Sequence, residues 1–537
     1  MYACNDDKRE EKMAAIIYQK NKKSGIIYVY ESVSHWDKEK KQSRAKRKCI
    51  GKLDPNTKEL IQTEKRKVKN KKVPFSKRFF HGATFLFDQI GAQLGLTDDL
   101  KKCFPDTYKQ ILSIVYYLIL EDKNSLSRFN KWASLHTHPF GDSLASQRIS
   151  ELFSSIKEGE KEKFFKLQGK RRENEEYWAY DITSISSYSQ ALKQIKYGKN
   201  KENDKLPQIN LALIFGEKSM LPFYYRKLAG NISDVKTVKK LIQDINYLKQ
   251  KKTKLVMDRG FYSAENVNNL YKNHIKFLIG TKLSLTYVKT ELNKIREEIK
   301  FWDNFSEKFG VYAKTTAISW DYKQSRPYKG DFLEEKRRMY LHFYHSIERA
   351  SEEEKSHNKL LLKLQNEIKS GNLNPKNEVL YKKYFNTSST PVKGIKITAK
   401  EEAIREARKN YGYFALISNE IKDPLKALEI YRNKDVVEKA FENLKDRLSF
   451  RRARVSSEQS LGGKIFVEFI ALIYLSHIKK VMIENKLNNK HTTQTFLDEF
   501  DIIECYQRNN KKTKWGEITK KQMGLFKIMG IDESSLQ

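Results

Sequence analysis

The fold of this chain is decided by residues 177–282, which begin with the stretch YWAYDITSIS (177–186). Apolar and β-branched side chains dominate this stretch, which is typical of a buried strand. Six further elements are expected in the order strand, strand, helix, strand, helix, strand, at residues 208–215, 221–228, 234–250, 254–258, 263–273 and 275–280. This order predicts an antiparallel three-stranded meander that continues into parallel strands through helical crossovers.

The same order predicts an RNase H-like α/β fold, in which a mixed sheet is flanked by helices. In that fold the first and fourth strands are neighbours at the centre of the sheet, so Asp181 and Asp258 would lie side by side. A charged residue in or next to an apolar strand is costly unless it has a partner or binds a metal ion. Each aspartate alone also has a simpler explanation: a turn cap for Asp181 and an ion pair with Arg259 for Asp258.

A third acidic residue lies in the later stretch YRNKDVVEKAFENLK, residues 431–445. On one continuous helix, Lys434, Glu438, Phe441 and Lys445 are spaced so that they share a face. Glu438 is then held between two lysines. The alternative is an ordinary amphipathic helix whose charges sit in water, with Glu438 paired only to Lys434.

Two strand aspartates and one helix glutamate are the ligands that a pair of divalent metal ions needs. Hard cations prefer carboxylate oxygens, and Mg²⁺ keeps water ligands beside phosphate oxygens. Two such ions activate the attacking oxygen and stabilise the leaving oxygen of a displacement at phosphorus. We therefore expect Asp181, Asp258 and Glu438 to hold two Mg²⁺ ions, for which Mn²⁺ can substitute.

The charge of the chain points to a polyanionic partner. Its 537 residues include 104 Lys and Arg against 67 Asp and Glu, which gives a net charge of +37. Nucleic acid is the first candidate for such a basic protein. Two basic runs, at 38–48 and 65–73, lie in the N-terminal part and suggest a DNA-contacting unit there, although each run alone is more often a solvated loop.

The cellular context follows from the cysteines and from the apolar segments. The four cysteines lie far apart and form no CxxC pair, so we expect neither a zinc site nor a disulfide framework, and a cytoplasmic, nucleoid-associated protein. The longest apolar stretches, 111–120 and 466–475, are shorter than the roughly 20 residues that span a bilayer. They are predicted to be buried helices, and we expect no membrane association.

Changes in composition along the chain predict several regions. These are a β-rich basic unit (1–75), a helical domain (76–175), the first part of the catalytic core (176–282), an insertion (283–410), the second part of the core with the 431–445 helix (411–455) and a C-terminal helical region (456–537).

The stretch 431–445 and the surroundings of the two aspartates resemble the DDE transposases of bacterial insertion sequences, in the branch with the signature Y-x2-R-x3-E-x6-K. The signature falls on Tyr431, Lys434, Glu438 and Lys445, so lysine replaces the arginine of the family. Lysine keeps the positive charge but loses the forked contact to phosphate. The surroundings of both aspartates, YDITSIS and MDRGFYS, also look like the corresponding family motifs.

The resemblance implies Mg²⁺-dependent cleavage at terminal inverted repeats, followed by attack of the freed 3′-hydroxyl on target DNA. It implies Asp181, Asp258 and Glu438 as metal ligands, and contacts to double-stranded DNA from the signature residues; Arg259 is a further candidate for such a contact. A homodimer in the DNA complex is also implied. Two alternatives remain open: an RNase H-like nuclease that cuts without strand transfer, and a DNA-binding derivative that has lost catalysis.

Overall fold

The structure is a computed structural model, and it divides into two compact units, residues 1–75 and 76–537. The described residues are 14–37, 40–62, 76–121, 125–171, 176–187, 192–198, 206–247, 253–326, 330–390, 394–442, 445, 448, 457–508 and 514–536. Each unit is described by itself below.

The N-terminal unit is a four-stranded antiparallel sheet with almost no core of its own. Its strands pair in chain order: β1 (Ala14–Lys20), β2 (Ile27–Asp37), β3 (Gln42–Leu53) and β4 (Leu60–Gln62). Among the described hydrophobic side chains of this unit only Val29 is buried, and Trp36 is 63% exposed. The basic run predicted at 38–48 leads into β3, where its residues are exposed, and the run at 65–73 lies outside the described residues.

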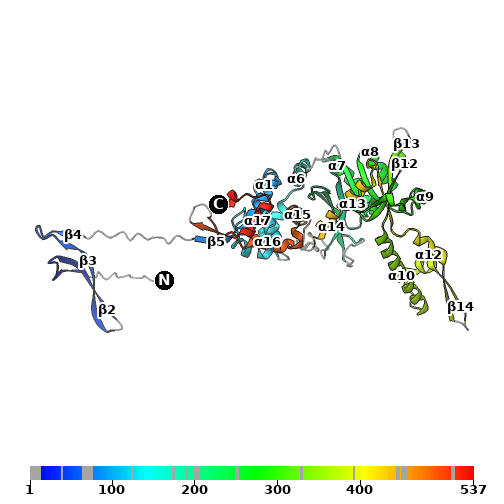
Figure 1. Ribbon diagram of the computed structural model, residues 1–537. Coiled ribbons are helices and arrows are strands. Elements are labelled where there is room, and N and C mark those ends of the chain that lie inside the picture. Colours follow the sequence, from blue (N-terminus) through cyan, green and yellow to red (C-terminus); the bar gives the residue numbers. More distant parts are fainter. Residues whose placement is uncertain are drawn as a thin grey trace, which may run out of the picture. The chain divides into compact units, whose positions relative to one another are not determined.

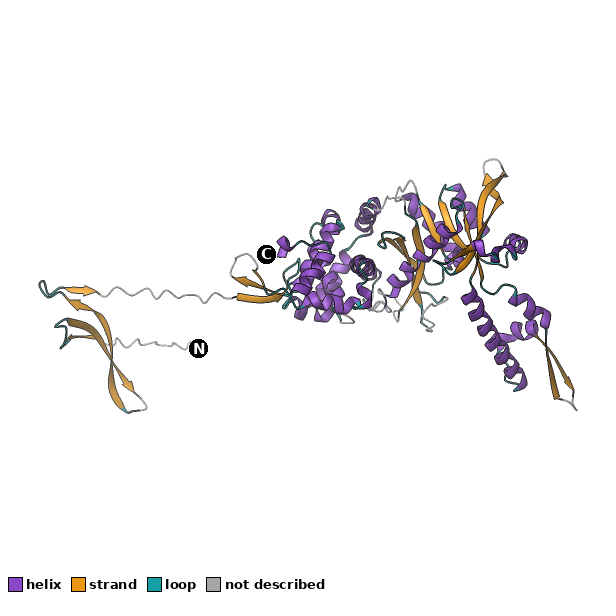
Figure 2. Cartoon of the chain, in the orientation of Figure 1, coloured by secondary structure: helices purple, strands orange, loops and turns teal. Residues whose placement is uncertain are grey.

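The second unit begins with a helical layer, which the C-terminal helices join (Figures 1 and 2). Its helices are α1 (Gly82–Gln93), α2 (Leu96–Cys103), α3 (Tyr108–Leu120), α4 (Phe129–Ala133), α5 (Ser146–Ser155), α6 (Glu158–Lys170), α15 (Glu458–Glu484), α16 (Thr493–Asp501) and α17 (Lys520–Ile528). A small sheet of β18 (Lys514–Trp515), β17 (Glu504–Arg508) and β5 (Ser76–Phe80) ties the two ends of this layer together.

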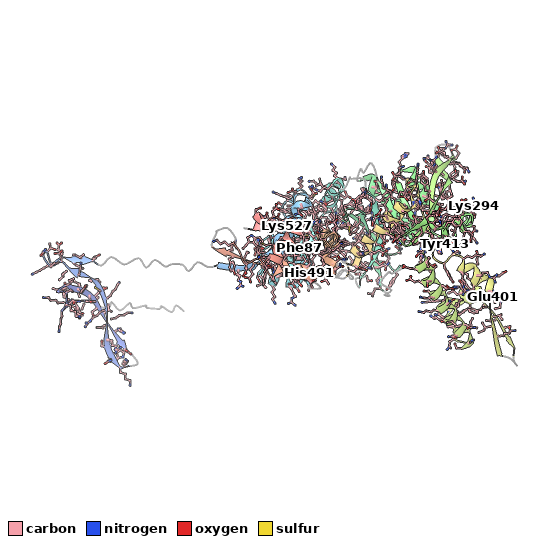
Figure 3. All side chains as sticks on the ribbon, viewed as in Figure 1. Phe87, Lys294, Glu401, Tyr413, His491 and Lys527 are labelled. Carbon is pink, nitrogen blue, oxygen red and sulfur yellow. The ribbon has the colours of Figure 1, made fainter. Side chains whose placement is uncertain are left out.

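Aromatic packing around α15 builds the core of this layer. Phe87, labelled in Figure 3, packs its ring against Tyr116 on α3 and Tyr474 on α15, with ring centroids 5.1 and 5.9 Å apart. In the described part of the chain, α15 is the one helix long and apolar enough to cross a membrane, but 83% of its most apolar window is buried within the protein. The prediction of buried helices at 111–120 and 466–475 is therefore confirmed.

The central sheet has nine strands, and its first five confirm the predicted mixed topology. They are β6 (Trp178–Ser186), β7 (Gln208–Gly216), β8 (Pro222–Ala229), β9 (Lys254–Met257) and β10 (Lys276–Thr281). The full order is β11-β12-β13-β16-β10-β9-β6-β7-β8, so the first and fourth of these five strands are neighbours. β6 pairs antiparallel with β7 and parallel with β9, which is the arrangement expected of an RNase H-like sheet.

Each face of this sheet is covered by different helices. Helices α7 (Asp234–Tyr247), α8 (Ala264–Lys272) and α9 (Thr286–Ile295) share one hydrophobic cluster with side chains such as Tyr180 and Met257. On the opposite face, Ala179 and Val256 belong to the cluster that contains α13 (Pro424–Asn433), α14 (Asp435–Glu442) and the helical layer. Because side chains alternate along a strand, Asp181 and Asp258 are directed to this second face.

The segment predicted as an insertion, 283–410, contributes strands to the central sheet. The strands β11 (Phe305–Ser306), β12 (Val311–Arg326) and β13 (Asp331–His345) extend it, and β13 pairs with β16 (Tyr413–Ser418), as Figure 1 shows for the long β12–β13 hairpin. Helix α9 of this segment covers the sheet, and the later part of the segment forms a separate outgrowth, made of α10 (Ile347–Lys369), α11 (Glu378–Tyr384), β14 (Phe385–Thr390), β15 (Gly394–Ala399) and α12 (Glu401–Arg408). The sequence analysis predicted this region only as an insertion and did not predict that its strands join the central sheet.

Close packing of α15 on α5 gives a testable consequence. A Cβ added to Gly463 of α15 would lie 1.9 Å from the backbone oxygen of Phe153, whereas one added to Gly524 of α17 would meet nothing within 4 Å. We expect Gly463→Ala to destabilise the chain by about 1–3 kcal/mol through overpacking. Gly524→Ala should be neutral or stabilise it by roughly 0.5–1 kcal/mol, because alanine favours a helix interior. Thermal unfolding of both variants tests this, and equal melting temperatures would contradict the packing.

Candidate active site

The two predicted aspartates meet because β6 and β9 run parallel in register. The paired residues are Trp178 with Leu255, Ala179 with Val256 and Tyr180 with Met257, so Asp181 and Asp258 occupy the next pair of positions. Asp181 lies within β6 and is partly buried, and its Oδ1 accepts a hydrogen bond from the N–H of Ile182 at 2.8 Å. Asp258 comes directly after β9 and precedes the 3₁₀ turn Arg259–Phe261.

Tyr431 orients the Asp258 carboxylate through a hydrogen bond. It lies near the end of α13 (Pro424–Asn433), and its hydroxyl donates a hydrogen bond to Asp258 Oδ1 at 2.6 Å. Burial raises the pKa of Tyr431, and the negative charge of Asp258 raises it further, so the phenol stays protonated and remains a donor. The sequence analysis predicted that Tyr431 contacts DNA, whereas in this structure its hydroxyl forms a hydrogen bond to the carboxylate of Asp258.

The pKa of Asp258 is lowered in spite of its burial. Burial alone would raise it, but the hydrogen bonds from Tyr431 and from the backbone of Arg259, and the positive charges of Lys434 and Arg259, outweigh that effect. Asp258 is therefore held as a carboxylate, the form that binds a cation. Arg259 itself is exposed, so its guanidinium is accessible to a nucleic acid strand.

The stretch 431–445 is not the single continuous helix that the sequence predicted. Helix α13 ends at Asn433 and α14 spans Asp435–Glu442, with Lys434 between them. The N–H of Val437 donates to the carbonyl of Lys434 at 2.9 Å, a tighter turn than the regular helical bond. Lys445 lies outside α14 and is partly exposed, so Lys434, Glu438 and Lys445 do not share one helix face.

Lys434 is the most buried of the predicted charged residues. Only 4% of it is exposed, and its ammonium lies 5.3 Å from the centre of the Tyr431 ring. Its Nζ is 3.7 Å from Oε1 of Glu438, whose own side chain is 63% exposed. An ion pair with one exposed partner contributes little to stability, about 0.3–0.5 kcal/mol for this helical spacing. Lys434 thus supplies a positive charge beside Asp258. The Glu438 carboxylate is directed towards Lys434.

The three predicted acids are only partly brought together. Helix α14 packs on β6 and β7, so Glu438 belongs to an element that covers the aspartates. Within the residues that the structure describes, however, His, Cys, Asp and Glu side chains do not gather in any group of three or more that could hold a metal ion. The adjacent aspartates have the donor chemistry of a hard divalent cation, and Glu438 lies outside their group. Assignment of the three acids to catalysis stays a prediction.

Sequence reasoning missed two features of this site. A Cβ added to Gly280 of β10 would lie 2.8 Å from the Tyr431 hydroxyl and 2.9 Å from the Arg259 nitrogen, so glycine leaves room for the Tyr431–Asp258 contact. Glycine inside a strand can signal such a close approach. The second feature is a hydrogen bond of 3.0 Å from Asn433 Nδ2 to Glu217 Oε2, for which the sequence carries no signal.

Adjacent carboxylates on the first and fourth strands of an RNase H-like sheet, covered by a lysine-bearing helix pair, are the architecture of a metal-dependent nuclease or transposase. Residues 163–475, more than half of the chain, match the family described as Transposase DDE domain. The chain belongs to this family, and the resemblance inferred from its motifs is confirmed at that level.

Comparison with solved structures shows similarity to one described as the cryo-EM structure of a piggyBac transposase synaptic complex with hairpin DNA. The identity is 10% and the TM-score 0.32, and the match covers 77% of this chain and 70% of that one. Comparison with curated proteins gave no match.

The Tyr431–Asp258 hydrogen bond predicts a pH-dependent contribution to stability. Because the pKa of Asp258 is lowered in the folded chain, its stabilisation is present above the unfolded pKa of about 3.9 and is lost as the pH falls through the folded value. In EDTA, Tyr431→Phe should lower the free energy of unfolding by about 1–2 kcal/mol at pH 7 and by less near pH 3.

Tyr287→Phe is the matched control, because the Tyr287 hydroxyl bonds to the neutral hydroxyl of Tyr262 at 3.0 Å. Its effect should be the same at both pH values. Urea unfolding at pH 7 and pH 3 measures both variants, and a constant cost for Tyr431→Phe would show that the hydrogen bond does not depend on the carboxylate.

Proposed function

We propose that this transposase-family chain binds the terminal inverted repeats of an insertion sequence, cleaves DNA strands by metal-dependent phosphoryl transfer and joins the 3′-hydroxyl ends to target DNA. The observation that carries the proposal is the register of β6 and β9, which sets two carboxylates side by side beneath a buried lysine. Membership of the transposase family and the net charge of +37 support DNA as the substrate.

In this proposal Asp181 and Asp258 hold the metal, with Mg²⁺ as the native ion and Mn²⁺ as a substitute, and Glu438 completes the site for a second ion. The ions, when bound, stabilise the charge that develops on the attacking and leaving oxygens. Tyr431 keeps Asp258 oriented, and Lys434 balances the negative charge beside it. Arg259 and Lys445, both accessible to solvent, contact the phosphates of the strand.

The lysine at position 434 changes what the signature does in this chain. A buried ammonium 3.7 Å from Glu438 is a point charge without the fork that lets arginine clamp a phosphate. Glu438 must leave this ion pair to join the aspartates, so Lys434 becomes free to meet a phosphate oxygen when the metals bind.

The three described cysteines are unpaired thiols, which supports a cytoplasmic location.

The three proposed metal ligands, Asp181, Asp258 and Glu438, form a triad whose charges can be removed one at a time. Asp181→Asn, Asp258→Asn and Glu438→Gln should each abolish Mg²⁺-dependent cleavage and joining, because an amide keeps the shape of the carboxyl but loses the charge that holds the ions. The control is Glu429→Gln on the neighbouring helix α13, which removes an exposed carboxylate that pairs with Lys308.

The assay incubates each variant with labelled DNA from the ends that flank its gene, Mg²⁺ and a target plasmid. Cleavage at the wild-type rate by any triad variant would remove that residue from the site. Cleavage by the wild type without joining, even from pre-cut ends, would show a nuclease rather than a transposase.

The N-terminal sheet is the proposed DNA-binding unit. Arg44, Lys46 and Lys48 of β3 alternate, so they project from one face, and all three are exposed. A sheet with so little core can present both faces to a partner, and β-ribbons are known to enter DNA grooves.

Replacing Arg44, Lys46 and Lys48 together by alanine should weaken DNA binding and flatten its dependence on salt. Each lost phosphate contact reduces the magnitude of the negative slope of log affinity against log salt by about 0.9. Replacing Lys20, Lys22 and Lys23, which lie at the end of β1 and in the following turn, removes the same charge from the same unit and serves as control. Equal slopes for the two triple variants, measured by fluorescence anisotropy with a labelled duplex, would remove the β3 face as the binding surface.

A further inference from the structure

The junction between α13 and α14 decides where Glu438 lies. Helix α13 packs over β9, β10, β12 and β13, whereas α14 packs over β6 and β7. The two helices therefore cover different strands of the sheet, and Lys434 lies at the break between them. Glu438 lies one turn into α14, so a rotation at the junction moves its carboxylate relative to Asp181 and Asp258.

Two side chains at this junction form hydrogen bonds to residues at the ends of sheet strands. Tyr431 bonds to Asp258, as described above, and Asn433, the last residue of α13, donates from Nδ2 to Glu217 Oε2 at 3.0 Å. Glu217 comes directly after β7, and its N–H donates to the carbonyl of Tyr177 at 2.9 Å. The side chain of Asn433 thus reaches the end of the strand pair over which α14 must lie.

Glu217, the acceptor of this hydrogen bond, is buried. Only 3% of it is exposed, and burial raises the pKa of its carboxyl, which the hydrogen bond from Asn433 partly offsets. The charged groups that act on it are Lys218, Glu176 and Glu429. A buried carboxyl without its donor is costly, so Glu217 favours the hydrogen bond to Asn433, whose own side chain lies at the exposed end of α13.

We propose that Glu217 and Asn433 form a positioning pair that fixes the direction of α14 and thereby the position from which the Glu438 side chain reaches the two aspartates. The pair touches neither metal nor DNA and acts through the helix junction. Its link to catalysis rests on the proposed function, because Glu438 is taken there as the third metal ligand. The anchoring itself does not depend on that function.

A swap of the two polar groups tests the pair. Asn433→Asp sets a carboxylate against the buried carboxyl of Glu217, so the hydrogen bond is lost and the two groups repel. Glu217→Gln in the same chain restores a donor, since the amide of the new side chain can donate to the new aspartate. The double variant should therefore recover what the single Asn433→Asp variant loses, whereas a purely volumetric role would leave both variants alike.

The matched control is Asn377→Asp in the outgrowth. Asn377 donates from Nδ2 to Glu367 Oε2 at 2.9 Å, which is the same chemistry at a site distant in sequence from the junction. This variant carries the same charge change as Asn433→Asp. It should alter neither α14 nor metal binding.

Hydrogen exchange of the full chain without metal reads out the anchoring. Asn433→Asp should accelerate exchange of the amides of 435–442 by about tenfold, as expected for loss of a hydrogen bond to a buried carboxyl. The double variant should return them towards the wild-type rate. Unchanged exchange in Asn433→Asp, or failure of the double variant to recover, would overturn the proposal.

Calorimetric titration with Mn²⁺ tests the link to Glu438. Asn433→Asp should weaken Mn²⁺ binding in the same direction as Glu438→Gln, and the double variant should restore it. Wild-type Mn²⁺ affinity in Asn433→Asp would disprove the placement of Glu438 by this pair. If the wild type itself binds no Mn²⁺, the proposed function fails, and the exchange experiment still decides on the anchor.

Discussion

The parallel pairing of β6 with β9 is the constraint on which the site depends. It places two carboxylates at adjacent positions of a sheet whose surrounding side chains are buried. Like charges at this separation repel, so the surrounding chain must stabilise them. A phenol hydroxyl, a backbone N–H and the positive charges of Lys434 and Arg259 do this for Asp258. Tyr431 comes from α13, which packs on β9, Arg259 begins the turn that follows β9, and Lys434 directly follows α13.

The helix pair α13–α14 covers the face of the sheet on which the two aspartates lie. Tyr431 reaches Asp258, and Gly280 leaves the space that this contact requires. Lys434 lies at the break between the helices, where burial concentrates the effect of its charge on nearby carboxylates. Glu438 is the exposed member of the three acids, and its position depends on how α14 is held.

The two units of the chain have different sources of stability. Residues 76–537 contain extensive hydrophobic clusters on both faces of the central sheet. The sheet of residues 14–62 buries almost no apolar side chain and carries its basic residues on exposed strands. A sheet of this kind gains most from a partner that covers it, and its charge favours a polyanion.

The sequence by itself determined the order of strands and helices from 177 to 282, the neighbouring positions of Asp181 and Asp258, and the buried character of the segments 111–120 and 466–475. These follow from local periodicity and from the few ways in which such elements connect, so they are readable from one chain. Periodicity also suggested that 431–445 is one helix, and there it was wrong. The break at Lys434 arises because α13 and α14 pack on different strands, and no local pattern records that.

Only the tertiary structure decided that β12 and β13 extend the central sheet, that Glu438 faces Lys434 rather than the aspartates, and that Glu217 meets Asn433. Each of these depends on contacts between residues far apart in the chain. Such contacts are set by the free energy of packing whole elements together, which a spacing of residue types along one segment does not express.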